Sequence, residues 1–156
     1  MYPTGKYISD GKIQTEKLLT SPGDTLYALA FHLLYDETIQ VGKKGTFSFE
    51  RGTYIYIGSA KKNMEARLNR HLSVDKKLRW HIDYIREKMH FIEGQTYLER
   101  RGECQLVEAT ATYVQATRPI SQFGASDCKC KGHLLFVPYF STGEGWLLPR
   151  EKWKRM

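Results

Sequence analysis

The chain lacks the segments that a membrane or exported protein needs. No stretch of its 156 residues approaches the roughly 18 consecutive apolar residues of a membrane-spanning helix. Residues 1–23 mix charged residues and glycine with scattered apolar ones, and they contain no apolar core of a signal peptide. We therefore expect a cytoplasmic protein with no membrane partner.

The chain is also poor in cysteine. It has three, an odd number that argues against a disulfide framework in a chain without an export signal. Free thiols or metal ligands are the uses that remain for these side chains. The spacing of cysteine and histidine therefore bears on metal binding.

Acidic residues are outnumbered by basic ones. The 24 Lys and Arg against 17 Asp and Glu give a formal net charge of +7 and a pI near 9.3. Such a surface favours a polyanion such as nucleic acid as partner, although a basic balance can equally serve only to keep a protein soluble. At this length, 41% hydrophobic and 13% aromatic residues can bury the core of one compact domain.

The spacing of apolar residues, punctuated by Gly and Pro, divides the chain into strands and helices. The turn signal at 21–24 precedes an apolar run typical of a buried strand. From Asn63 the apolar residues recur at helical spacing. Strands are predicted over 25–34, 38–42, 45–49, 53–58, 92–98 and 133–137, and helices over 63–72, 77–89 and 102–117, with Pro119 ending the last helix.

The fourth expected strand and the helix after it carry side chains that could bind a phosphate. Tyr54 and Tyr56 share one face of the strand because side chains alternate, and Arg67 and His71 share one face of the helix because they are four residues apart. A guanidinium binds phosphate oxygens bidentately, and a phenol or imidazole can move a proton to or from water. The pattern indicates a phosphate-binding surface, but ordinary strand aromatics and a solvated helix face would produce the same spacing.

The same residues resemble the GIY-YIG nuclease superfamily. Tyr56-Ile57-Gly58 is similar to the second half of its signature, and Arg67 and His71 follow where that family has its helix Arg and a proton-transfer residue. Tyr27, in Thr25-Leu26-Tyr27, is the matching residue of the first half. The hairpin inserted at 39–49 and the segment Phe-Gly-Ala-Ser-Asp-Cys-x-Cys at 123–130 are similar to one uncharacterised branch of this superfamily.

Together, the elements and the resemblance predict an α+β fold, an α/β sandwich in which a small, mostly antiparallel central sheet is flanked by about three helices. We expect an N-terminal extension over 1–23, a GIY-YIG-like domain over 24–139 and a basic tail over 140–156. Because residues 146–156 are rich in Lys and Arg, this tail is a candidate electrostatic arm.

The resemblance implies metal-dependent hydrolysis of nucleic acid at a centre formed by Tyr27, Tyr56, Arg67 and His71. His81 stands near a further catalytic histidine of some members, although a His between Trp and Ile is as often a packed residue. One glutamate of the last helix would hold Mg²⁺ or Mn²⁺, since a carboxylate with several waters is how Mg²⁺ binds beside phosphates. The candidates are Glu108, which the spacing of the excision-repair relatives favours, and Glu103, which the branch resemblance favours.

We predict that nucleic acid is contacted by residues around this centre, namely Gly58, Ser59, Arg70, Lys76, Lys77 and Arg79. DNA is the expected substrate rather than RNA, and the predicted activity is that of an endonuclease. The alternative is a non-catalytic nucleic-acid-binding module that keeps the phosphate-binding surface and works with a partner enzyme. A third reading is a structural, zinc-stabilised partner protein.

A second metal site is predicted from Cys128-x-Cys130-x-x-His133. Cys104, on the last expected helix, could supply the fourth ligand of a tetrahedral zinc ion, and all three cysteines would then be used. Alternatively, the cysteines are free thiols, Cys104 being a small buried side chain, or the 124–130 loop brings Asp127 and His133 to the substrate.

Overall fold

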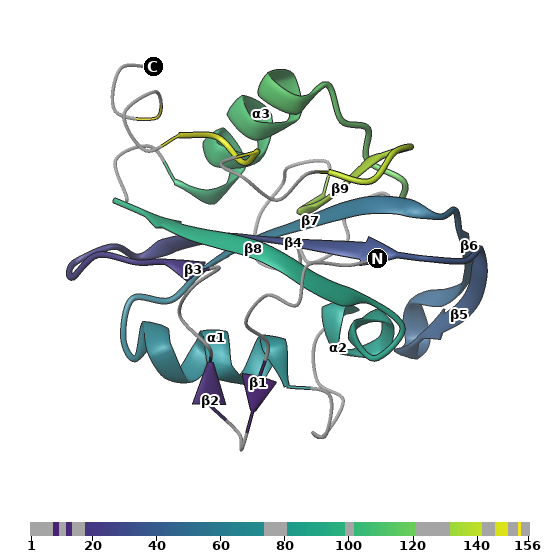
Figure 1. The fold of residues 1–156 in the computed structure, drawn as a ribbon, viewed down its shortest axis with the longest axis horizontal. Coiled ribbons are helices and arrows are strands. Elements are labelled where there is room, and N and C mark those ends of the chain that lie inside the picture. Colours follow the sequence, from purple (N-terminus) through teal and green to yellow (C-terminus); the bar gives the residue numbers. More distant parts are fainter. Residues whose placement is uncertain are drawn as a thin grey trace.

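The fold is built around one five-stranded sheet with helices on both faces (Figure 1). The computed structural model describes residues 18–73, 81–98, 102–120, 132–141, 146–149 and 153, and the backbone of 8–9 and 12–13. The strands lie in the order β3 (Leu18–Leu19), β8 (His90–Tyr97), β4 (Leu26–Leu33), β7 (Gly52–Ser59) and β9 (Leu134–Val137). β3 runs parallel to β8, and the other neighbours are antiparallel.

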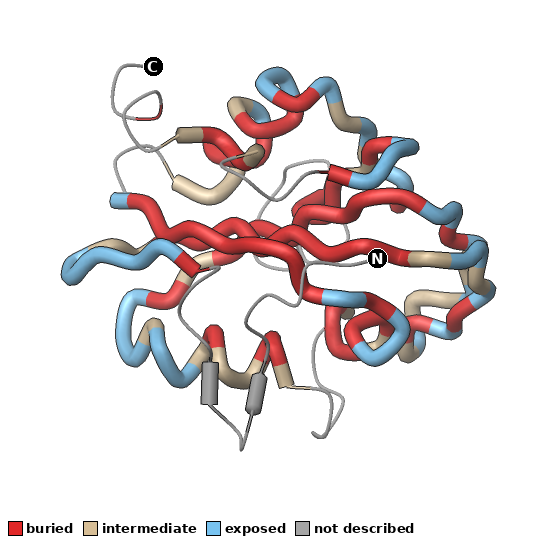
Figure 2. Tube along the Cα trace, in the orientation of Figure 1, coloured by how far each residue is buried: buried red, intermediate tan, exposed pale blue. Residues whose placement is uncertain are grey.

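Strand β4 is apolar throughout because both of its faces are covered. Tyr27, Leu29 and Phe31 point to one face and belong to one core cluster, whereas Leu26 and Ala28 point to the other face and belong to a second cluster. The side chains of strand β7 divide in the same way: Tyr56 points to the first face and its neighbour Ile57 points to the second. Figure 2 shows the sheet as a continuous buried band between the layers.

The first face of the sheet packs against α1 (Met64–Leu72) and α2 (His81–Arg86). Asn63, with a left-handed φ of 55°, precedes α1, whose Leu68 and Leu72 enter the core. The insertion forms the expected hairpin: β5 (Glu37–Val41) pairs with β6 (Gly45–Phe49) through a 3-10 turn, η2 (Gly42–Lys44). A short hairpin of β1 (Ile8–Ser9) and β2 (Lys12–Ile13) lies beside α1 (Figure 1).

The second face packs against α3 (Glu103–Val114) and against residues near the C-terminus. Helix α3 ends earlier than Pro119 would require, because Gln115 adopts a left-handed φ of 58°. Thr117, two residues after Gln115, then forms a bridge to Phe136 of β9, which takes the chain away from the helical path.

The C-terminal segment is part of the core, which corrects the expectation of a free basic arm for its described residues. Leu147, Leu148 and Trp153 are each at most 1% exposed. The Leu148 carbonyl accepts hydrogen bonds from Tyr97 Oη at 2.6 Å and from Gln95 Nε2 at 3.2 Å. Burial removes the apolar side chains of Leu147, Leu148 and Trp153 from water. This gain in free energy outweighs the preference for solvent of the Lys and Arg that surround them in the sequence.

The N-terminal extension also contributes to the sheet. Leu18 and Leu19 pair with Gly94 and Gln95 of β8, and the Leu18 side chain is buried. The predicted α+β fold, with a mostly antiparallel sheet and three α-helices among the described residues, is confirmed. None of the helices in this part of the chain is long and apolar enough to cross a membrane.

Candidate active site

The candidate site begins where β4 and β7 lie side by side. Tyr27 is opposite Gly58 in the antiparallel register. A Cβ placed on Gly58 would lie 2.3 Å from Tyr27 Oη and 2.6 Å from its Cζ. The glycine predicted as a nucleic-acid contact therefore has a packing role, because only a residue without a side chain lets the Tyr27 ring lie across the neighbouring strand.

Tyr27 is hydrogen-bonded to His71, and the two strand tyrosines pack around that histidine. The distance from Tyr27 Oη to His71 Nε2 is 2.6 Å. The ring centroids of Tyr27 and Tyr56 lie 5.3 Å and 5.4 Å from that of His71, and 6.4 Å from each other. The first face of the sheet thus holds two phenols and an imidazole in one buried group.

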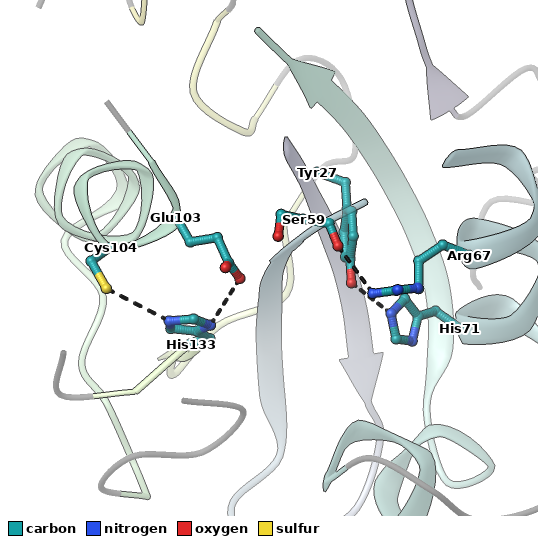
Figure 3. Close-up of polar contacts among 7 residues, drawn as sticks. All are labelled: Tyr27, Ser59, Arg67, His71, Glu103, Cys104 and His133. Atoms are coloured by element: carbon teal, nitrogen blue, oxygen red, sulfur yellow. Dashed lines mark hydrogen bonds and ion pairs between the residues drawn. The ribbon is translucent and has the colours of Figure 1, made fainter. Parts of the chain in front are cut away.

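Arg67 lies one helical turn before His71 and points to the same place (Figure 3). Its Nη1 donates a hydrogen bond of 3.0 Å to the carbonyl of Ser59, at the end of β7. Figure 3 draws the guanidinium beside the Tyr27 phenol, and its charge lowers the pKa of Tyr27. The structure therefore brings together the four residues predicted to form the catalytic centre.

Burial dominates the protonation of the two phenols. It raises the pKa of Tyr27 far above its usual value, and the Arg67 charge and hydrogen bond oppose the rise only in part. Burial likewise raises the pKa of Tyr56, with a further contribution from the neighbouring Tyr27. Both groups are consequently protonated phenols at neutral pH, and each can donate a hydrogen bond.

The two candidate glutamates of α3 have different surroundings. Glu103, in the first turn, raises the pKa of both Tyr27 and Tyr56 through its negative charge. Glu108 has a side chain that is 62% exposed and forms an ion pair of 2.5 Å with Arg118. The structure therefore brings Glu103 within electrostatic reach of the tyrosines and holds Glu108 at the surface.

Glu103 also takes part in a second cluster, with Cys104 and His133. Glu103 Oε1 lies 3.5 Å from His133 Nδ1, and Cys104 Sγ lies 3.9 Å from His133 Nε2. Burial lowers the pKa of His133, and the charge of Arg118 lowers it further, so the neutral imidazole is favoured. In Figure 3 the His133 ring is drawn between the two side chains of α3.

The remaining predicted residues either contact other partners or lie outside the described part of the chain. Arg70 Nη2 forms an ion pair of 2.7 Å with the buried carboxylate of Asp83, which links α1 to α2. His81 begins α2, where burial and the charge of Lys44 lower its pKa. The predictions for Lys76, Lys77, Arg79, Asp127, Cys128 and Cys130 concern residues outside the described part of the chain.

Two contacts of the site were not anticipated from the sequence. The direct bond between Tyr27 and His71 joins residues 44 positions apart, and spacing within one strand or one helix says nothing about it. The contact between Glu103 and His133 joins the start of α3 to the residue before β9. The sequence offers one signal for this contact. Glu103 and Cys104 are adjacent at the start of the predicted helix, and both are residue types that bind metals.

Within the described residues, no group of three or more His, Cys, Asp or Glu side chains could hold a metal ion by itself. A family model described as a domain of unknown function, DUF123, matches residues 26–144. No curated protein and no solved structure matches the chain.

Proposed function

We propose that this chain, which belongs to the DUF123 family, is a metal-dependent nuclease that hydrolyses phosphodiester bonds of DNA. The observation that carries the proposal is the hydrogen bond of 2.6 Å between Tyr27 and His71, with the Arg67 guanidinium beside it. These groups can move a proton and stabilise negative charge at one place, which is what attack of water on a phosphate requires.

The proton path runs from water through Tyr27 to His71. In the tautomer whose Nε2 carries no proton, His71 accepts the hydrogen bond from Tyr27 and can take the phenolic proton as Tyr27 takes one from water. The resulting hydroxide forms a bond to phosphorus, the bond from phosphorus to the leaving oxygen breaks, and that oxygen takes a proton from the medium. The raised pKa of Tyr27 makes its oxygen a strong base once the proton has moved.

Arg67 supplies the positive charge for this step. Its guanidinium keeps its charge at all relevant pH values and can bind two phosphate oxygens at once. Its hydrogen bond to Ser59 fixes the side chain at the end of β7. A guanidinium held in this way favours the charge that develops on the phosphate and on Tyr27 in the transition state.

Glu103 is the residue of α3 that suits a hard divalent cation. Mg²⁺ keeps several waters and commonly needs only one or two carboxylates beside a phosphate, so one partly exposed glutamate fits it. When bound, Mg²⁺ or Mn²⁺ would polarise the phosphate and neutralise its charge. The negative potential of Glu103 at both tyrosines supports its choice over Glu108.

The charge of the molecule supports a polyanionic substrate. The net charge is +7, and the exposed Lys61 and Lys62 lie on the loop between β7 and α1, close in sequence to Ser59. Basic groups beside a phosphate site strengthen binding through contacts with neighbouring phosphates.

The test is cleavage of single-stranded, duplex and branched DNA with Mg²⁺ or Mn²⁺. We expect Arg67→Ala to lower the cleavage rate by about 100-fold or more, because a preorganised charge at the transition state is lost. Arg51→Ala is the matched control, since Arg51 is exposed and its guanidinium lies over the Phe140 ring. If all three substrates stay intact in every protein, catalysis is not the function.

Two further pairs of variants sharpen this test. Tyr27→Phe keeps the ring and removes the proton-carrying oxygen, so the rate should fall by about 100-fold while the fold is kept. Glu103→Gln should abolish metal-dependent cleavage, whereas Glu108→Gln, at an exposed ion pair, should cleave within about 2-fold of the parent protein. The reverse order of the two glutamates would contradict the choice of Glu103.

A second candidate function, a binding module without hydrolysis, is favoured by the burial of the phenols. Tyr27 is 1% exposed and Tyr56 is 5% exposed, so little of either residue is in contact with bulk water. Affinity for DNA that falls steeply with salt, without turnover under any metal condition, would favour this function, because phosphate contacts release counterions.

A further inference from the structure

The active site described above gives no role to the hairpin of β5 and β6. This hairpin follows the end of β4, and Figure 1 shows it at that end of the sheet, beside α2. Tyr27 lies near the opposite end of β4, as the second residue of the strand. The hairpin is therefore set apart from the two tyrosines and the arginine of the candidate site.

The hairpin is held against the body of the protein by its inner side chains. Ile39, Val41 and Phe49 are each at most 8% exposed. They belong to the same core cluster as Leu72 of α1 and Ile82 of α2. Because these side chains are buried, the turn of the hairpin presents its outer residues from a fixed backbone, and a partner that binds them has little to order.

The turn of the hairpin, η2, packs on α2. Gly42 has a left-handed φ of 51°, and a Cβ placed on it would lie 3.0 Å from Tyr84 Oη. The next two residues are Lys43 and Lys44. Burial lowers the pKa of His81, at the start of α2, and the charge of Lys44 lowers it further. At neutral pH the positive charge of this place is therefore carried by the lysines and not by the histidine.

The tip and the base of the hairpin differ in charge. Lys43 is exposed and Lys44 is half-buried, and neither forms an ion pair with an acidic side chain of the described residues. Three carboxylates, those of Asp36, Glu37 and Glu50, lie at the base. The two ammonium groups at the tip are thus available to an anionic partner.

We propose that the tip of this hairpin, formed by Gly42, Lys43 and Lys44, binds the phosphate backbone of duplex DNA at a distance from the phosphate held in the active site. The inference rests on the proposed function, since it adds a second contact to the same substrate. An ammonium group is a compact charge with three donors, which suits phosphate oxygens. Contacts of this kind fix the position of the duplex and carry no sequence information.

A duplex bound at the active site is long enough to reach the tip. Strand β4 has 8 residues, which at about 3.3 Å per residue span about 26 Å. The phosphates of one DNA strand follow one another at about 3.4 Å along the duplex axis, so about 8 nucleotides cover this length. A regular row of phosphates can therefore engage both places at once, and this favours DNA over an acidic protein as the partner.

The test is the salt dependence of binding to a duplex of about 20 base pairs, measured without divalent metal. Each lost phosphate contact should lower the slope of log affinity against log salt by about 0.9, so the double variant Lys43→Ala/Lys44→Ala should lose nearly 2 in slope. Its affinity at about 0.1 M salt should fall by about 10-fold. The single variant Lys43→Ala should lose about half of this slope change.

Arg51→Ala is the matched control for the single variant Lys43→Ala. Both substitutions remove one positive charge, but Arg51 follows β6 at the base of the hairpin. We therefore expect Arg51→Ala to keep the slope of the parent protein. Equal slopes in Lys43→Ala and Arg51→Ala would show that only net charge matters, and this would overturn the role of the tip.

The outcomes separate this proposal from the nuclease function. A parent slope in the double variant overturns the tip and leaves cleavage by the active site untouched. The expected loss of slope, in a protein that cleaves no DNA with Mg²⁺ or Mn²⁺, contradicts only the nuclease function. A parent protein that binds no duplex overturns both. Loss of binding to poly-glutamate, with DNA binding unchanged, would assign the tip to an acidic protein and overturn the DNA contact.

Discussion

The two faces of the central sheet differ in where the partners of their polar side chains come from. On the α1 face, Tyr27, Tyr56, Arg67 and His71 all come from β4, β7 and the helix that follows β7. On the α3 face, the contacts reach across the chain, as when Tyr97 Oη donates to the carbonyl of Leu148.

The two faces differ in which segments of the chain they need. The polar group on the α1 face is built from two paired strands, β4 and β7, and from the one helix that follows them. The α3 face needs the last described residues of the chain, because Leu147, Leu148 and Trp153 cover the second core cluster. We therefore expect stability to depend most on the α3 face and chemistry to depend most on the α1 face.

The largest effect on stability should come from the C-terminal segment. Trp153 is 1% exposed, and its Nε1 donates a hydrogen bond of 3.0 Å to the carbonyl of Leu98. Trp153→Ala should lower the free energy of unfolding by about 4 kcal/mol, because a large buried side chain leaves a cavity. Tyr35→Ala, at a side chain that is 72% exposed, is the control and should change it by less than about 0.5 kcal/mol.

Chemical denaturation of both variants measures these changes. Equal effects of the two substitutions would mean that the C-terminal segment does not belong to the cooperative core, and the contrast between the faces would fail.

A pH dependence of stability is expected on the α3 face from His32. Burial lowers its pKa to about 4, and the hydrogen bond to Ser141 opposes this shift in part. The unfolded chain binds a proton at His32 near pH 6.5, whereas the folded chain does so only near pH 4. The stability that this group contributes is therefore complete above pH 6.5 and is lost as the pH falls towards 4, by about 3 kcal/mol.

Unfolding by urea at about pH 7 and about pH 4.5 checks this dependence. His32→Gln should have a smaller loss of stability over this interval than the parent protein. The same loss in both proteins would assign the acid sensitivity to other groups.

On the α1 face, Arg70 should affect stability more than DNA binding. Its guanidinium contacts the carboxylate of Asp83, whose side chain has no exposed surface, while the Arg70 side chain is 23% exposed. Arg70→Ala should lower the free energy of unfolding by about 2 kcal/mol, since a buried charge loses this partner and solvent only partly screens the pair.

A double-mutant cycle with Asp83→Asn isolates the energy of this pair. DNA affinity that falls in Arg70→Ala while stability stays unchanged would return Arg70 to the predicted nucleic-acid contacts.

The smallest of these effects should come from Gly58. A Cβ there would lie 2.3 Å from Tyr27 Oη, so Gly58→Ala should cost about 1–2 kcal/mol through overpacking. Tyr27→Phe removes the closest atom, and the double variant should be more stable than the sum of the single effects predicts. Thermal unfolding of the three variants measures this coupling, and strictly additive effects would show that the Tyr27 hydroxyl does not limit the space at Gly58.

Much of the α1 face was predictable because its signals are local. The alternation of side chains placed Tyr54 and Tyr56 together, and the spacing of four placed Arg67 with His71. The pairing of β4 with β7 was needed to bring Tyr27 into the same group. Which glutamate of α3 approaches the tyrosines could not be predicted, since helical spacing shows only that Glu103 and Glu108 point in different directions.

By itself, the sequence determined most of the strands and helices from β4 onward, the α+β class and the residues of the α1 face that share a strand or a helix, because these depend on periods of two and of nearly four residues. The tertiary structure decided that the C-terminal segment joins the core, that Tyr27 bonds to His71, and that Glu103 and Cys104 flank His133. These contacts join distant parts of the chain, and only the packing of both layers on the sheet brings such residues together.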